Sequence, residues 1–292
     1  MEINVILSES FEKWLKTLEY AESTVYLSVR YVNDFFFYLK SKDIRNLEQI
    51  SPATITSYYK HLQTRPQKKQ TGGLSQNYIT SNINAIKRFS KYLQVTGKGN
   101  LEITLQTPVN KETSKIIFSQ EEIKSLYKAC GSDYLGIRDR AILDIYYGCG
   151  LRRREGINLD IKDVMLKEKL VFVRAGKGYK ERYVPMTEAV KDDLENYIHT
   201  GHTSLLSSGL QMKEQALFLN ANGRRVSSNT LYLRLKYLVN EAGITKSTGL
   251  HTLRHSIATH LLQSGMTMEE VSRFLGHSSL ESTQIYTHLA NE

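Results

Sequence analysis

The segment HTLRHSIATHLLQSGMTMEEVSRFLGHSSLESTQIYTHL (residues 251–289) decides the fold of this chain. Apolar residues at helical spacing predict one helix over 251–264 and a second over 267–275, with a glycine between them. A capping box that begins at Ser278 predicts a third, short helix, which carries Tyr286. Three successive helices at this end of the chain indicate a mainly helical C-terminal domain.

The same domain extends back to Ser119, which forms a capping box with Glu122 and opens a helix. The stretches VFVRA (171–175) and YKERYVP (179–185) flank a Gly-Lys-Gly turn centred on Lys177, and together they predict a β-hairpin. We expect a mostly helical domain with one small antiparallel sheet. Its remaining elements are a short strand over 216–220 and a helix that Ser227 caps and that runs to about Glu241.

The N-terminal third predicts a second domain of four helices. Apolar residues recur on one face of residues 23–41, and Ser51 followed by Pro52 is typical of a helix start. The other two helices are expected over 8–20 and 75–95. The fold class is therefore mainly α, with an N-terminal helical domain and a larger mixed domain.

Glycine, proline and mixed charge break the helical pattern over residues 97–117, which we interpret as an interdomain linker. The domain boundaries then fall at 1–96 and 118–292. Within the first domain, the loop that holds Lys68 and Lys69 is basic and glycine-rich. It is either an ordinary solvated loop or, in a DNA-binding bundle, a contact to backbone phosphates.

The charge of the chain favours a polyanionic partner. Lysine and arginine number 39 against 30 acidic residues, and the pI is about 9.3. DNA, RNA and an anionic membrane surface all fit this balance, and so does an ordinary basic soluble protein. Two cysteines build no disulfide framework, no apolar run is long enough to span a membrane, and the N-terminus does not resemble a secretory signal. We expect a cytoplasmic protein that makes no contact with the membrane.

Tyr286 is a candidate nucleophile only if its neighbours favour the phenolate. A phenol has a pKa of about 10, so ionising it at pH 7 costs about 4 kcal/mol. The chain has 18 tyrosines, so this residue is weak evidence by itself. Its case depends on the cations that the rest of the sequence supplies.

Two arginines provide those cations. Arg254 lies three residues after His251, so both share one face of the predicted helix. Arg152 follows a Gly-Cys-Gly break and is expected at a helix N-terminus, a natural anion site. Two guanidinium groups on one phosphate would stabilise a five-coordinate transition state. A solvated basic face is the alternative for the Arg152–Arg154 cluster.

Lys177 and the histidines have competing interpretations. A lysine on a hairpin tip can act as a general acid toward a leaving 5′-oxygen, although turn lysines are commonly idle. His251 and His255 have the spacing of a metal pair, but the glutamate of HExxH is missing and no Cys/His cluster supplies further ligands. We therefore expect no metal and no other cofactor. Residues 258–277 also match a helix-turn-helix, which would predict DNA binding alone.

These motifs resemble the tyrosine recombinase (phage integrase) family, Xer and integrase proteins included, over nearly the whole chain. GLRRRE (150–155) is similar to the first arginine motif of the family, GKGYKERYVP (176–185) to its lysine hairpin, HTLRH to its H-x-x-R motif and LGHSSLESTQIYTH to its last motif. The N-terminal helices are similar to its SAM-like core-binding domain. The resemblance implies a catalytic set of Arg152, Lys177, His251, Arg254, His277 and Tyr286, with Glu155 as a supporting acid.

The resemblance also implies a reaction and an assembly. Tyr286 would form a 3′-phosphotyrosyl bond, and strand exchange would pass through a Holliday junction during integration, excision, inversion or resolution. A homotetramer would act on two double-stranded DNA sites with inverted repeats, starting from monomers or dimers in solution. The residues expected on DNA are Lys68, Lys69, Arg153, Arg154, Arg224, Arg225 and Arg234.

Two other functions stay open: a non-catalytic DNA-binding regulator on the same scaffold and a type IB topoisomerase-like enzyme. The chain departs from the family pattern at Arg154 and Gly156, where a small and an aliphatic residue are common. Six residues follow Tyr286, so exchange of a C-terminal helix between protomers is not expected.

Overall fold

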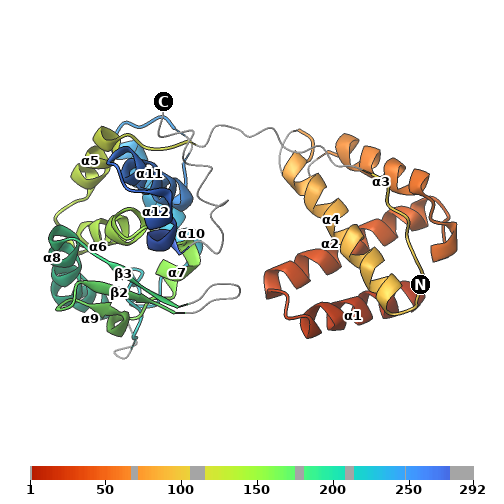
Figure 1. The fold of residues 1–292 in the computed structure, drawn as a ribbon, viewed down its shortest axis with the longest axis horizontal. Helices are drawn as coiled ribbons and strands as arrows, with labels where there is room; N and C mark the ends of the chain where they lie inside the picture. The colour runs from red at the N-terminus through yellow and green to blue at the C-terminus, as the bar shows by residue number, and fades with distance from the viewer. Residues whose placement is uncertain are drawn as a thin grey trace. The chain divides into compact units, whose positions relative to one another are not determined.

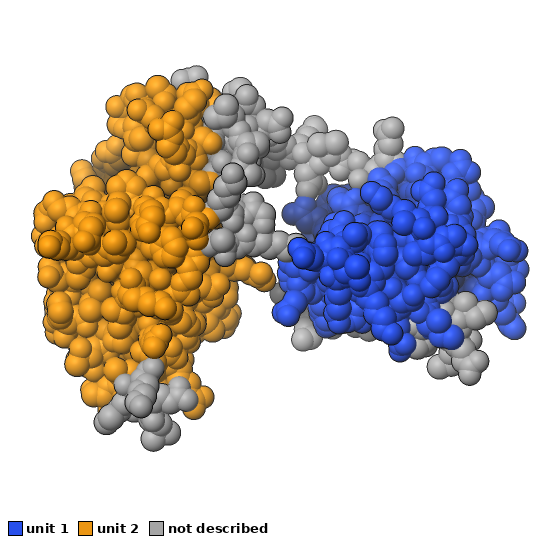
Figure 2. Space-filling view, turned by 60° about the horizontal axis from the view of Figure 1, so that its bottom comes forward, with its two compact units in different colours: residues 1–113 blue, residues 114–292 orange. Residues whose placement is uncertain are grey.

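The computed structural model divides into two compact units, Met1–Thr113 and Ser114–Glu292 (Figures 1 and 2). The structure describes residues 2–66, 72–105, 116–174, 181–207, 214–246 and 248–276. No helix within these ranges is both long and apolar enough to cross a bilayer.

The N-terminal unit confirms the four predicted helices (Figure 1). Its elements are α1 (Glu2–Thr17), α2 (Glu22–Ser41), the 3-10 turn η1 (Leu47–Gln49), α3 (Pro52–Thr64) and α4 (Gln76–Val95). α1 ends before residue 20 because Glu19 adopts a left-handed conformation, with φ of 53°, which reverses the chain. Ser51 and Ser75 accept hydrogen bonds from Thr54 N–H and Tyr78 N–H, so local capping sets the starts of α3 and α4.

Aromatic side chains fill the core of this unit. Phe11, Phe35, Tyr58 and Phe89 are completely buried, and they stack or meet edge to face with further rings of α1, α2, α3 and α4. Leu101 is buried in the same core, with Ile103 and Leu105 packed against it. The first part of the predicted linker, up to residue 105, therefore packs as part of the N-terminal unit.

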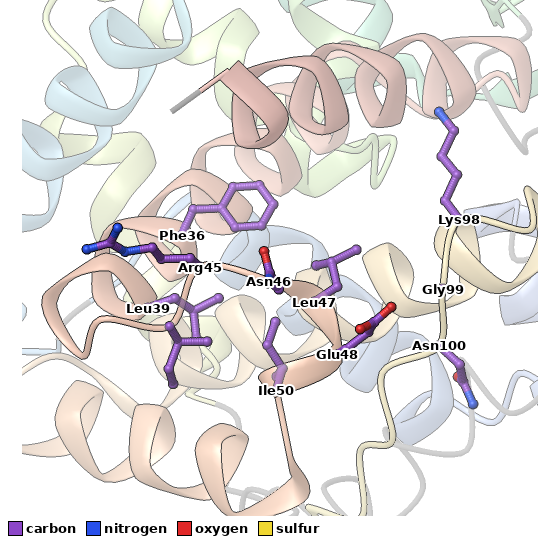
Figure 3. Close-up of a pocket in the computed structure, with 11 residues that line it drawn as sticks. Phe36, Leu39, Arg45, Asn46, Leu47, Glu48, Ile50, Lys98, Gly99 and Asn100 are labelled. Atoms are coloured by element: carbon purple, nitrogen blue, oxygen red, sulfur yellow. The ribbon is translucent and has the colours of Figure 1, made fainter.

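A pocket of about 370 Å³ lies beside η1 in this unit (Figure 3). Its walls come from the end of α2, from residues 44–50 and from residues 98–100. Phe36, Leu39 and Ile50 supply apolar surface, and Arg45 and Glu48 supply charge. None of the predicted catalytic residues lines this pocket, so we do not assign it to the active site.

The larger unit is mostly helical. Ser119 and Glu122 form the predicted capping box at the start of α5, and the helices predicted over 251–264 and 267–275 are α11 and α12. The elements in chain order are α5 (Gln120–Ala129), α6 (Tyr134–Leu143), the π-helix η2 (Asp144–Gly148), α7 (Arg153–Ile157), η3 (Ile161–Asp163), β1 (Val164–Met165), β2 (Leu170–Val173), β3 (Arg182–Pro185), α8 (Glu188–Asn196), the π-helix η4 (Tyr197–His202), α9 (Thr203–Ser207), α10 (Ser228–Glu241), α11 (Leu250–Gln263) and α12 (Met268–Leu275).

The three strands form an antiparallel sheet in the order β1-β2-β3. β2 and β3 pair with Val171 opposite Val184 and Val173 opposite Arg182, which confirms the strands of the predicted hairpin. Its Gly-Lys-Gly turn lies outside the described residues. The valines are buried on one face of the sheet, and Tyr183 is exposed on the other, as period-two alternation requires.

The strand predicted over 216–220 is wrong. Ala216 and Leu219 each make one isolated bridge, to Asp160 and Arg225 respectively. Because the segment pairs with two different partners over one residue each, no continuous ladder forms. Its run of apolar residues instead fills the core, where residues 216–219 are completely or almost completely buried.

Candidate active site

Arg152 and Glu155 lie at the start of α7. Gly150 has a φ of 61°, a left-handed turn that lets the chain leave η2 and enter α7 within a few residues. Arg152 is the N-cap residue, and its backbone N–H donates to Glu155 Oε2 over 2.8 Å. Its guanidinium donates to Glu155 Oε1 over 2.9 Å. The carboxylate therefore fixes both the backbone and the side chain of Arg152.

Arg254 approaches the same place from α11. It is buried, with 3% of its surface exposed, and it donates to the carbonyl oxygens of Gly150 and Leu275. Arg152 donates to the carbonyl of Gly276 over 2.9 Å. The two guanidinium groups thus hold consecutive carbonyls at the end of α12, one residue before His277. Three of the sequence motifs meet here.

His251 lies in the first turn of α11, beside these arginines. Desolvation, together with the positive charges of Arg153, Arg254 and Arg152, lowers its pKa below the ordinary value. A neutral imidazole at pH 7 can accept or share a proton near a bound phosphate. The ring of His255 lies 6.3 Å from it, and the described residues hold no group of three metal-ligating side chains.

Arg182 is a site residue that the sequence did not single out. It is the first residue of β3, and its guanidinium donates to both oxygens of Glu155 over 3.0 Å. An alternating strand gives no signal that one of its arginines faces a carboxylate 27 residues earlier. The sequence signal that could have indicated Arg182 is its position within the GKGYKERYVP motif.

Two glycines are explained by close approach. A Cβ on Gly276 would lie 2.6 Å from Arg182 Nε, so the glycine that precedes His277 leaves room for this arginine. A Cβ on Gly156 would lie 2.6 Å from the phenol of Tyr146, whose hydroxyl donates to Arg153 O over 3.0 Å. The Tyr146 ring occupies the space that an aliphatic residue would need at position 156.

Several predicted residues lie outside the described part of the chain. These are Lys68, Lys69, Lys177, His277 and Tyr286. The capping box predicted at Ser278 lies there too.

The arginines predicted on DNA divide into two groups. Arg153, Arg154 and Arg224 are exposed. Arg225 instead pairs with Asp160 and donates to the carbonyls of residues 157 and 159, and Arg234 pairs with the buried Asp139. The guanidiniums of Arg225 and Arg234 are therefore engaged within the unit.

The acidic first turn of α12 argues against the helix-turn-helix interpretation of residues 258–277. α12 would be its recognition helix, and the first turn of such a helix contacts the base edges. Here that turn carries Glu269 and Glu270, both exposed, which would repel phosphates. The apolar residues of α12, Val271 and Leu275, pack with Ala258 of α11.

The comparisons with known proteins agree with this geometry. The model of the phage integrase family matches residues 117–292. Tyrosine recombinase XerD of Oceanobacillus iheyensis is 34% identical over 274 residues, which cover 92% of this chain and 88% of the relative. The crystal structure of XerA recombinase is 28% identical, with a TM-score of 0.54, over 98% of this chain and 94% of that one.

A crystal structure of the XerH recombinase bound to palindromic difH has a TM-score of 0.73 over 97% of this chain and 81% of that one, and at 23% identity it shows the fold. The family model covers more than half of the chain, and the XerD match covers nearly all of it. The chain therefore belongs to the phage integrase family: it is a site-specific tyrosine recombinase, an enzyme that binds DNA, cleaves it and rejoins it.

Proposed function

We propose that Arg152 and Arg254 bind the scissile phosphate and that Tyr286 attacks it. The observation that supports this most is the meeting of both guanidiniums at the carbonyls of residues 275 and 276. Two arginines close together in a partly buried site give a strong positive field. Such a field favours a phenolate and stabilises the added charge of the transition state. His277 follows directly and is proposed as a further phosphate ligand.

The proposed reaction is a balanced transesterification. The Tyr286 phenolate oxygen forms a bond to phosphorus as the bond from phosphorus to the 5′-oxygen breaks, which leaves a 3′-phosphotyrosyl linkage. Lys177 gives its proton to the departing 5′-oxygen. A 5′-hydroxyl from a partner duplex then returns a proton to Lys177 and attacks the linkage, which releases Tyr286 as a phenolate and produces a Holliday junction. One phosphodiester replaces another, so no nucleotide is consumed.

The proposed assembly is a homotetramer on two duplex sites with inverted repeats. Solved structures of similar fold include XerH on palindromic difH and a lambda integrase tetramer bound to a Holliday junction. Residues 1–96 would serve as the core-binding domain and 118–292 as the catalytic domain. The exposed arginines at positions 153, 154 and 224 and the lysines at 68 and 69 are proposed to contact phosphates. The proposed compartment is the cytoplasm, which suits two free cysteines.

The test is a covalent adduct on a nicked suicide duplex that carries the target site. We expect wild type to give a denaturant-stable protein–DNA band and Tyr286→Phe to give none. Tyr237→Phe is the matched control, because it removes the same hydroxyl group from an exposed tyrosine of α10, and it should keep the band. Binding without any adduct would favour the regulator. Relaxation of a supercoiled plasmid without a second site would favour the topoisomerase-like enzyme.

The role of Lys177 has a separate test. Lys177→Ala should slow cleavage of an ordinary duplex. A substrate with a 5′-bridging phosphorothiolate should restore the rate, because a thiolate leaves without being protonated. Equal slowing on both substrates would contradict the general-acid role.

A further inference from the structure

Glu155 is shared by two arginines from different elements. Arg152 of the α7 N-terminus donates to it from the backbone and the side chain, and Arg182 of β3 donates with both terminal nitrogens. The side chains of these three residues are 18%, 11% and 12% exposed for Arg152, Glu155 and Arg182. Charges that are this well shielded from water interact more strongly than surface pairs.

The charges of this cluster, formed by Arg152, Glu155 and Arg182, sum to one positive charge. Burial of Glu155 opposes its ionisation, but the hydrogen bonds and charges of Arg182 and Arg152 outweigh this effect and lower its pKa to about 2. Glu155 is therefore a full anion at neutral pH. Without Arg182 this anion would have Arg152 as its remaining partner in the cluster, and the cluster would become neutral.

We propose that Arg182 is a positioning residue for strand cleavage. It balances the charge of Glu155, so that Glu155 orients Arg152 without cancelling the positive charge that Arg152 presents to the scissile phosphate. This inference rests on the proposed role of Arg152. Arg182 acts through Glu155 and does not need to touch DNA.

The surroundings of Arg182 support this indirect role. Both terminal nitrogens point at Glu155, and the buried Nε finds no hydrogen-bond partner among the described residues. Gly276 has no side chain, and its backbone lies against the guanidinium. The same Gly276 accepts a hydrogen bond from Arg152. Arg182 thus contacts two of the groups that hold Arg152 in place.

A purely structural role is the competing explanation, because the same ion pair fastens β3 to α7. Arg174 gives a matched control for it. This arginine follows β2, on the other side of the hairpin, and pairs with Asp160 and Asp163 instead of Glu155. Arg174→Met removes an arginine anchor from the hairpin and leaves the charge of the cluster unchanged.

The experiment measures single-turnover cleavage of the suicide duplex by Arg182→Met, Glu155→Gln, the double variant and Arg174→Met. We expect Arg182→Met to lose about tenfold to a hundredfold, by analogy with the loss seen when a residue that orients a metal-binding side chain is removed. Glu155→Gln removes the anion, so the double variant should cleave about tenfold faster than Arg182→Met alone, a coupling that only interacting residues show. Arg174→Met should stay within about threefold of wild type.

Two further measurements keep the result decisive. Circular dichroism reports whether each variant is folded. If Arg182→Met is unstable, Arg182→Lys takes its place in the test. Lysine keeps the charge at this position, so this variant should retain most of the wild-type cleavage rate. A double variant no faster than Arg182→Met, or an Arg174→Met as slow as Arg182→Met, would overturn the proposal. If wild type itself forms no adduct, the proposed function fails separately. The same variants are then compared by their affinity for the intact duplex. Arg182→Met should bind the duplex more weakly than wild type, and the double variant with Glu155→Gln should bind it more tightly than Arg182→Met alone.

Discussion

Both units have an apolar core, but they differ in how well their ion pairs are shielded from water. Rings pack on rings in the N-terminal unit, and its best-shielded described ion pair, Arg65–Asp34, still has side chains that are 27% and 29% exposed. In the larger unit, Ser114–Glu292, which we call the catalytic unit, Asp139 is 1% exposed and pairs with both Arg138 and Arg234. Glu155 of the same unit pairs with Arg152 and Arg182. Among the residues that the structure describes, buried arginine–carboxylate pairs occur in the catalytic unit alone.

The physical reason is directionality. Apolar packing has no preferred direction, so it stabilises a scaffold without fixing the orientation of a polar group. A guanidinium bound to a carboxylate or a carbonyl has a defined plane and a defined set of donors. The proposed role of Arg152 and Arg254 as phosphate ligands requires such a defined orientation.

Phe89→Ala should destabilise the N-terminal unit by about 3–5 kcal/mol, the usual cost of removing a buried phenylalanine. Phe89 is completely buried and meets the rings of Phe11 and Phe36 at 5.3 and 5.5 Å. Trp14 is the one tryptophan in the chain and lies beside this core, so its fluorescence in urea reports on this unit. Phe37→Ala, at a residue that is 75% exposed, should change little. Equal losses for the two variants would contradict the ring-packed core.

Arg254→Lys should slow cleavage by about a hundredfold to a thousandfold, the cost of losing one well-placed donor group at a transition state. Lysine keeps the charge but cannot hold the carbonyls of Gly150 and Leu275 while it also faces a phosphate. DNA affinity should be largely retained in a gel-shift assay. Arg138→Lys is the control, because Arg138 is equally buried but donates to Asp139 and Leu219. The folded fraction of Arg138→Lys should cleave at the wild-type rate. If Arg254→Lys instead loses DNA binding and cleavage in parallel, the transition-state role of Arg254 is contradicted.

Gly156→Ala should destabilise the catalytic unit by about 1–3 kcal/mol, the range for overpacking a tight core. The new methyl group would overlap the ring of Tyr146, which is completely buried. Thermal unfolding followed by circular dichroism measures the loss. Gly73→Ala in the N-terminal unit, where the nearest atom is 3.7 Å away, should cost little. A neutral Gly156→Ala would mean that the packing around α7 is loose.

The smallest effect concerns pH and compares one histidine from each unit. Desolvation and neighbouring arginines lower the pKa of His251 and of His61. The unfolded histidine takes up a proton near pH 6.5 while the folded one stays neutral, so stability should fall as the pH drops below about 6.5. His251→Gln should flatten this dependence in the catalytic unit. His61→Gln should flatten it in the N-terminal unit, as followed by Trp14, and an unchanged slope in either variant would contradict the lowered pKa.

Much of the fold followed from local signals. Serines at 51, 75, 119 and 227 each cap the predicted helix, because a cap involves residues only a few positions apart. The two strands of the hairpin followed from alternation for the same reason. The strand predicted over 216–220 failed because a short apolar run suits a buried loop as well as a strand.

The site was predicted in part. The sequence singled out Arg152, Glu155 and Arg254, and the structure brings them together. Arg182 escaped notice, and the engagement of Arg225 and Arg234 in internal ion pairs was not foreseen. Composition and spacing do not record whether an arginine faces solvent, a carboxylate or a nucleic acid. The sequence alone therefore does not distinguish these cases.

The order and spacing of the motifs, the helix starts and the basic character were properties of the sequence itself, since they depend on neighbours along the chain. The partners of each charge were decided by the tertiary structure. Arg254 reaches Gly150 across 104 residues, and Arg182 reaches Glu155 across 27. Such contacts form only when distant segments pack side by side, because burial removes the water that would otherwise solvate each charge and leaves a protein group as its partner.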